Sequence, residues 1–195
     1  LSASLKMGLP IGGLVKKTIY RQFCGGEDII ACRETVEKLS HYNVGSILNY
    51  SAEGKTAEKD FDFAVIEVLK TIKEAKGNPC VSFCVFKMSG LGRVKLFERV
   101  RSGSDISESE EQELNRIRTR VGALCRSAFD SGVKILIDAE ESWIQDAIDT
   151  LAGEMINRYN KEQAIVYNTI QMYRKDRLEF LKNSVTTAVE RGHKL

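Results

Sequence analysis

The chain has 195 residues, of which 43% are hydrophobic and 29% are charged, a composition typical of a soluble globular protein with one sizeable core. Its 29 lysines and arginines nearly balance 27 aspartates and glutamates, and the basic residues are scattered through helical stretches, which argues against nucleic acid as a partner. Apolar runs such as residues 80–86 are far shorter than the roughly 20 residues that cross a bilayer, so we expect no transmembrane helix, and the first residues do not resemble a secretion signal.

The five cysteines predict neither a metal site nor a disulfide. They form an odd set without repeated C-x-x-C spacing. Cys80 and Cys84 lie in one predicted strand, where residues four apart are about 13 Å distant at ~3.3 Å per residue. We therefore expect no bound metal and five buried thiols in a reducing cytoplasm: Cys24, Cys32, Cys80, Cys84 and Cys125.

In chain order, the pattern predicts two helices and then a repeated strand and helix unit. The first helix covers 9–23, with Pro10 near its start and two glycines after its end, and the second covers 27–42. Four short apolar segments are predicted as strands: 44–50, 81–87, 133–138 and 164–171. Each is followed by a predicted helix: 60–75, 107–131, 141–159 and 176–191. Ser107 and Glu110 have the spacing of a capping box.

Strands that are apolar throughout and alternate with helices indicate an α/β fold with a parallel sheet. An open doubly wound sheet would favour a glycine-rich phosphate loop after a strand, and neither Gly90–Gly92 nor Gly25-Gly26 provides one. We therefore predict the first four βα units of a (β/α)8 TIM-type barrel, an incomplete barrel. In this interpretation residues 1–43 are N-terminal helices and residues 44–195 are the first half of the barrel. A complete four-stranded domain is the alternative, less favoured because its sheet edges would be open.

Polar residues stand where the predicted strands end. Lys87 ends the second strand, Asp138 the third and Gln171 the fourth, while Asn49 and then Glu53 follow the first. The carboxyl ends of parallel strands meet at one edge of the sheet, so we expect Lys87, Asp138 and Gln171 to converge, with Lys87 and Asp138 paired. A solvent-facing lysine, an N-cap aspartate and a loop-binding glutamine are the structural alternatives. A lysine in this place is compatible with a Schiff base, as in class I aldolases, and with binding of an anionic substrate.

Five collinear segments resemble proline dehydrogenases, specifically the FAD-dependent bacterial type. The third strand end, 135–142 (ILIDAEES), is similar to the family's I-D-A-E-E/Q segment. The others follow the same order as in the family: 23–27 (FCGGE), 48–53 (LNYSAE), 85–92 (VFKMSGLG) and 170–173 (IQMY).

This resemblance implies a distorted barrel that binds FAD and transfers a hydride from C5 of L-proline to flavin N5, giving Δ1-pyrroline-5-carboxylate. It implies that electrons then pass to a quinone, with the enzyme in the cytoplasm and in peripheral contact with the inner membrane. By position, Lys87 resembles the lysine that binds the proline carboxylate, and Asp138 resembles the aspartate beside it in the active site. Ala139 and Gln171 resemble residues that contact FAD, and Glu53 resembles an acidic gate residue that pairs with an arginine.

Two departures from the family pattern matter. Asn49 replaces an aspartate that the family often has, which leaves its role open. The family's flavin-binding arginine and lysine after strand five, and the paired arginines of its last helix, would lie after Leu195. We therefore expect this chain alone to be inactive and to self-associate. The competing hypotheses are a Schiff-base aldolase that uses Lys87 and a non-catalytic, self-associating half-barrel.

Overall fold

The computed structural model describes residue 13, residue 18 and residues 20–50 and 54–195. The chain divides into two compact units, Leu1–Ser46 and Ile47–Leu195. In the first unit, the described helices are α3 (Arg21–Phe23) and α4 (Ile29–Ser40). Asp28 caps α4 because its carboxylate accepts the backbone N–H of Ala31 at 2.8 Å. Most of the predicted helix over 9–23 lies outside the described residues.

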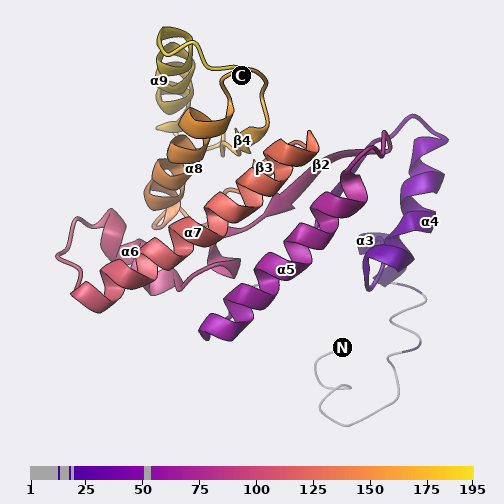
Figure 1. Ribbon diagram of the computed structural model, residues 1–195, viewed down its shortest axis with the longest axis horizontal. Coiled ribbons are helices and arrows are strands. Elements are labelled where there is room, and N and C mark those ends of the chain that lie inside the picture. Colours follow the sequence, from indigo (N-terminus) through magenta and orange to yellow (C-terminus); the bar gives the residue numbers. More distant parts are fainter. Residues whose placement is uncertain (1–12, 14–17, 19, 51–53) are drawn as a thin grey trace. The chain divides into compact units, whose positions relative to one another are not determined.

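The rest of the chain contains four strands and the helices between them (Figure 1). The strands are β1 (Ser46–Asn49), β2 (Val81–Phe86), β3 (Ile135–Ile137) and β4 (Val166–Asn168). The helices are α5 (Glu58–Ala75), the 3-10 turn η2 (Met88–Gly90), α6 (Val94–Arg101), α7 (Glu108–Ser131), α8 (Gln145–Tyr159) and α9 (Arg177–Glu190). The predicted alternation of strands and helices after residue 44 is confirmed, and all four strands are shorter than expected.

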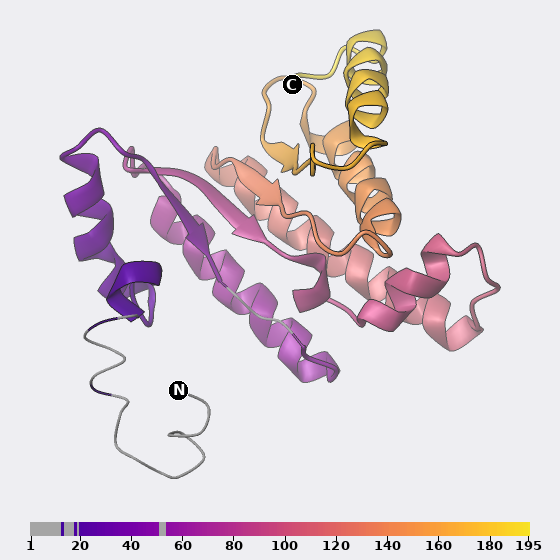
Figure 2. The same ribbon diagram turned by 180° about the vertical axis from the view of Figure 1, so that it is seen from behind.

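The sheet has the order β1-β2-β3-β4. Strands β2, β3 and β4 run parallel, with Phe86 opposite Ile137 and Ile137 opposite Asn168. Figures 1 and 2 show α5 and α7 on the same face of the sheet, and α7 in turn packs on α8. Helices on a single face are the arrangement of a barrel, whereas a doubly wound sheet carries them on both faces.

Successive side chains of a strand point to opposite faces of the sheet. The two faces of this sheet differ in how deeply their side chains are buried. The face under the helices contains side chains that are essentially inaccessible, including Cys84, Phe86, Ile135 and Ile137. On the opposite face, the rings of Phe83 and Tyr167 meet edge to face at 5.1 Å between centroids.

Local signals set the bounds of the longest helix. Ser107 accepts the N–H of Glu110, and the Glu110 carboxylate accepts the N–H of Ser107, so the predicted capping box is confirmed. At the other end, Gly132 has φ 66° and ψ 23°, the left-handed conformation that glycine adopts without a steric penalty. The chain can therefore leave α7 and enter β3 within a few residues.

The outer edge of β4 is partly closed by a side chain. Ile165 and Thr169 bond to β3, so by alternation the backbone groups of Val166 point to the other side. The Val166 N–H donates to Asn160 Oδ1 at 2.9 Å, and its C=O accepts from Asn160 Nδ2 at 2.8 Å. Asn160, only 2% exposed, thus occupies the positions that a neighbouring strand would use.

Two expectations are corrected. Cys24 is exposed and Cys32 and Cys80 are partly buried, so only Cys84 and Cys125 are the buried thiols expected of all five. Strand β4 ends at Asn168, so Gln171 is not part of its pleat. The chain turns here through hydrogen bonds from Met172 N to Ile170 O and from Arg174 N to Gln171 O.

Of the helices that the structure describes, none combines the length and the apolarity needed to cross a bilayer.

Candidate active site at the strand ends

Lys87 and Asp138 meet at the carboxyl ends of β2 and β3. Each directly follows its strand, and the Asp138 N–H extends the ladder by donating to Phe86 O at 3.0 Å. Lys87 Nζ lies 3.7 Å from Asp138 Oδ2, which confirms the predicted pair. The two side chains remain 26% and 32% exposed, so solvent and a ligand have access to both.

The structure does not bear out the N-cap alternative for Asp138. Helix α8 begins at Gln145 with Ile144 in the cap position, so Asp138 is too early in the chain to cap it. Lys87 faces one carboxylate directly, and the charge of Glu140 also acts on it. Negative groups stabilise an ammonium, whereas Schiff-base chemistry requires the neutral amine.

The two residues predicted to contact a cofactor lie beside this pair. Ala139 follows Asp138, and its N–H donates to Asp138 Oδ1 at 3.0 Å. The Gln171 amide reaches across from the segment after β4, with Nε2 donating to Glu140 O at 2.7 Å. Gln171 Oε1 is buried and has no hydrogen-bond partner in the described part of the chain. Gln171 thus joins the group through Glu140, although it lies outside the strand. Glu53, the predicted gate, lies outside the described residues.

Glu140 is a site residue that the sequence reasoning missed. It is 8% exposed, and its Oε1 accepts the backbone N–H of Ser89 at 2.9 Å. A signal was present in the sequence, because Glu140 directly follows Asp138-Ala139 within the segment that resembles the family. Burial raises the pKa of the Glu140 carboxyl, and the Ser89 hydrogen bonds and the positive charge of Lys87 oppose that rise.

A cavity of about 380 Å³ opens beside Lys87 and Glu140, and Asp138, Ala139 and Gln171 are not among its lining residues. It is lined by Gly54, Lys87, Ser89, Val94, Glu140, Glu141 and Tyr173. Both cationic and carboxylate groups face it, so the cavity is suited to a small zwitterion. Its place at the carboxyl ends of the strands is where parallel α/β folds carry their chemistry.

The raised pKa of Glu140 predicts a pH dependence of stability. A carboxyl whose pKa is higher in the folded state contributes stability below its unfolded pKa, and this contribution is lost as the pH rises through the folded pKa. Charged neighbours on the packed segments are Lys87 after β2, Asp138 after β3 and Glu141 beside it. Glu140→Gln keeps an acceptor without titrating, so relative to this variant the wild type should lose stability as the pH rises above about 4.3, the usual pKa of a glutamate in an unfolded chain.

Thermal unfolding at several pH values measures this difference. The exposed Glu162 provides a matched control, since Glu162→Gln removes a carboxylate that solvent surrounds. A gap between wild type and Glu140→Gln that stays constant with pH would contradict the prediction.

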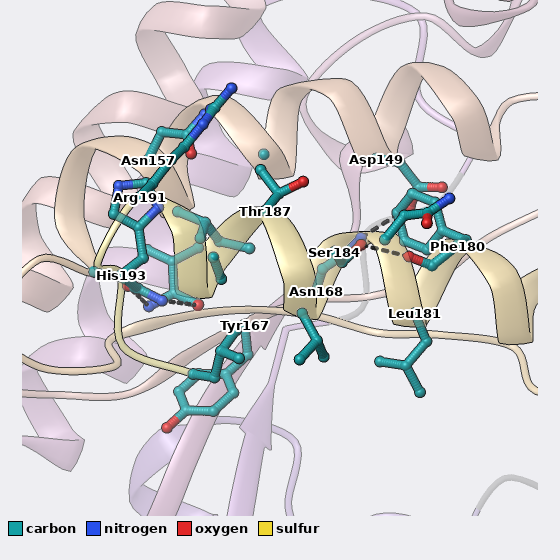
Figure 3. Close-up of a pocket in the computed structure, with 18 of the residues that line it drawn as sticks. Asp149, Asn157, Tyr167, Asn168, Phe180, Leu181, Ser184, Thr187, Arg191 and His193 are labelled. Atoms are coloured by element: carbon teal, nitrogen blue, oxygen red, sulfur yellow. Dashed lines mark hydrogen bonds between the residues drawn. The ribbon is translucent and has the colours of Figure 1, made fainter.

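A larger cavity lies away from these residues, between α8, β4 and α9 (Figure 3). It has a volume of about 550 Å³, and its lining includes Tyr167 and Asn168 of β4 and Ser184 and Thr187 of α9, which Figure 3 labels. None of Lys87, Asp138, Ala139 and Gln171 contributes to its lining. Its walls are largely apolar, and the polar groups that we identify as site residues gather at the strand ends instead.

Comparison with known proteins identifies relatives of this chain. A family model described as proline dehydrogenase matches residues 32–195. The carbapenem antibiotics biosynthesis protein CarD of Pectobacterium carotovorum is 32% identical over 159 residues, covering 82% of this chain and 42% of that protein. Proline dehydrogenase 1, mitochondrial, of Arabidopsis thaliana is 31% identical over 228 residues, covering 96% of this chain and 46% of that protein. The chain spans less than half the length of these relatives.

The fold also matches solved structures. Proline utilization A from Bdellovibrio bacteriovorus, in the form inactivated by N-propargylglycine, superposes with a TM-score of 0.75 at 17% sequence identity. The match covers 93% of this chain and 20% of that one. At this identity the comparison establishes a shared fold.

Proposed function

This chain belongs to the proline dehydrogenase family, and from that premise we propose that it carries part of a site that oxidises L-proline to Δ1-pyrroline-5-carboxylate. The observation that carries the proposal is the Lys87 and Asp138 pair at the strand ends, beside a Gln171 amide whose oxygen is buried without a partner among the described residues. We further propose that the four strands form part of a (β/α)8 barrel, which the position of α5 and α7 on one face of the sheet supports.

In the proposed site, Lys87 binds the carboxylate of proline. Lys87 Nζ lies 3.7 Å from Asp138 Oδ2, and its side chain is 26% exposed, so a small anion has access to the ammonium. Asp138 holds the ammonium toward the cavity and offers a negative group to the secondary amine of proline. Fixing both ends of the small ring orients its C5 hydrogen, and such orientation lowers a reaction barrier by several kcal/mol.

The residues present fit a flavin. Gln171 Oε1 is a buried acceptor that needs an N–H donor, and the isoalloxazine ring carries one at its imide position. The Ala139 backbone lies next to the Asp138 carboxylate, within the same turn of chain. Gln171 and Ala139 would therefore hold the ring edge. When bound, FAD would supply the hydride acceptor, while the protein contributes orientation and hydrogen bonding.

Further parts of the proposal concern the whole protein. We propose that a quinone takes the electrons, that the protein is cytoplasmic with peripheral contact to the inner membrane, and that Glu53 acts as a gate. Because the chain spans less than half of its relatives, these roles apply to the full gene product that contains residues 1–195. We also propose that the isolated chain of residues 1–195 self-associates.

A direct test uses the full gene product under anaerobic conditions. Addition of L-proline at millimolar concentration is expected to bleach the absorbance of its bound flavin, because hydride transfer reduces the ring. D-proline serves as a control that has the same charges and the wrong stereochemistry. A flavin that stays oxidised with L-proline would count against the assignment, and covalent trapping of a carbonyl compound on Lys87 by borohydride would favour the aldolase hypothesis.

A further inference from the structure

Glu140 connects the ends of three strands through separate atoms. Its side chain reaches the segment after β2, its backbone lies after β3, and its carbonyl receives the amide of Gln171 from the segment after β4. The Ser89 contact joins residues 51 positions apart in the sequence, and the Gln171 contact joins residues 31 positions apart. Glu140 therefore connects the segments that follow β2, β3 and β4.

The contact with Ser89 controls how the chain leaves β2. Ser89 lies in the 3-10 turn η2, which begins directly after Lys87, and Gly90 N donates to Lys87 O at 3.1 Å. The Glu140 carboxylate takes the one donor that Ser89 has on its backbone, at 2.9 Å. Ser89 is 7% exposed, so water is poorly placed to replace that bond. Anchoring Ser89 thereby anchors the turn from which the Lys87 side chain extends.

The Glu140 backbone is itself held in place. Its N–H donates to Gln145 Oε1 at 2.9 Å, and Gln145 Nε2 donates to Asp149 Oδ1 at 2.9 Å. Gln145 is 1% exposed, at the start of α8. This chain of bonds links the Glu140 backbone to α8, so Glu140 cannot shift without breaking buried hydrogen bonds.

We propose that Glu140 is a positioning residue that sets Lys87 and Gln171 relative to each other at the strand ends. The expected effect of Glu140 on the KM for L-proline rests on the proposed function, because Lys87 is the group proposed to bind the substrate carboxylate. Glu140 acts in this role through the turn after β2 and through its own carbonyl. The hydrogen bond that it accepts, more than its charge, carries the effect.

The test compares Glu140→Ala with Glu140→Gln in the full gene product. Alanine removes the acceptor for the Ser89 N–H, so we expect the KM for L-proline to rise roughly tenfold or more. Glutamine keeps an oxygen in the same place, and its KM should stay within about threefold of wild type. In a Lys87→Met background, Glu140→Ala should change the KM less than about twofold, because two residues that act together are not additive.

A readout independent of activity is the NMR resonance of Lys87 after reductive ¹³C-methylation, assigned by its loss in Lys87→Met. Glu140→Ala should move this resonance and Glu140→Gln should leave it near its wild-type position, whether or not the protein oxidises proline. A wild type that does not oxidise proline would defeat the proposed function alone. An unmoved resonance in Glu140→Ala, or equal shifts in both variants, would overturn the positioning role even if the wild type is active.

Discussion

Replacing Lys87 by methionine in the full gene product should weaken L-proline binding by roughly 30- to 150-fold, because one charge-assisted contact of about 2–3 kcal/mol is lost. Methionine is of similar length and carries no charge, so the substitution tests the ammonium and not the bulk of the side chain. The flavin should remain bound in normal amount, since the residues proposed to hold it are Ala139 and Gln171. Asp138, which is 32% exposed, keeps partial access to water when its partner is removed.

Proline affinity is measured by titrating the enzyme and following the flavin spectrum, with flavin content determined on the same samples. Lys161→Met is a matched control, because Lys161 is exposed in the segment before β4, at the opposite ends of the strands. It removes the same charge from the protein and should leave affinity unchanged. If Lys87→Met binds proline as the wild type does, Lys87 does not serve as the anion partner.

Replacing Arg177 by methionine is expected to destabilise the fold by about 3–5 kcal/mol, the usual result of breaking a buried ion pair from one side. Arg177 is 3% exposed at the start of α9 and pairs with Asp149 of α8, whose side chain is 7% exposed. It also reaches Asp146 Oδ1 at 3.2 Å. Asp149 accepts further bonds from Gln145 and Asn168, both at 2.9 Å, but these amides are neutral and leave its charge uncompensated.

Urea unfolding measures this loss as a shift of the midpoint at an unchanged slope. Arg126→Met is the control: Arg126 pairs with Asp130 one turn later on α7, at side-chain exposures of 63% and 50%. Such an exposed pair contributes about 0.5 kcal/mol or less. The double variant Arg177→Met/Asp149→Asn should recover part of the lost stability, since it removes the stranded charge. Equal effects of Arg177→Met and Arg126→Met would show that the buried position adds nothing.

Much of the architecture was predictable from the sequence because its signals are local. The segments that became β1 to β4 are short and almost continuously apolar, and the longest helix between β2 and β3 carries its own capping box and terminal glycine. The position of Lys87 and Asp138 also followed from local order. Each is the first polar residue after its strand, and parallel strands that share one direction bring such residues to one edge.

The tertiary structure decided which other residues join the site. The sequence placed Gln171 within a strand pleat, whereas the strand ends at Asn168 and the amide reaches Glu140 from a turn. In the sequence Glu140 is one of two adjacent glutamates, and its burial and its Ser89 bond across 51 residues distinguish it from the exposed Glu141. The pairing of Arg177 with Asp149, 28 residues apart, also could not be predicted from the sequence. Secondary-structure propensity and hydrophobic periodicity depend on residues that are close in the sequence. A buried polar group instead needs a partner because burial removes its water, and which residue becomes that partner depends on the segments that pack over it.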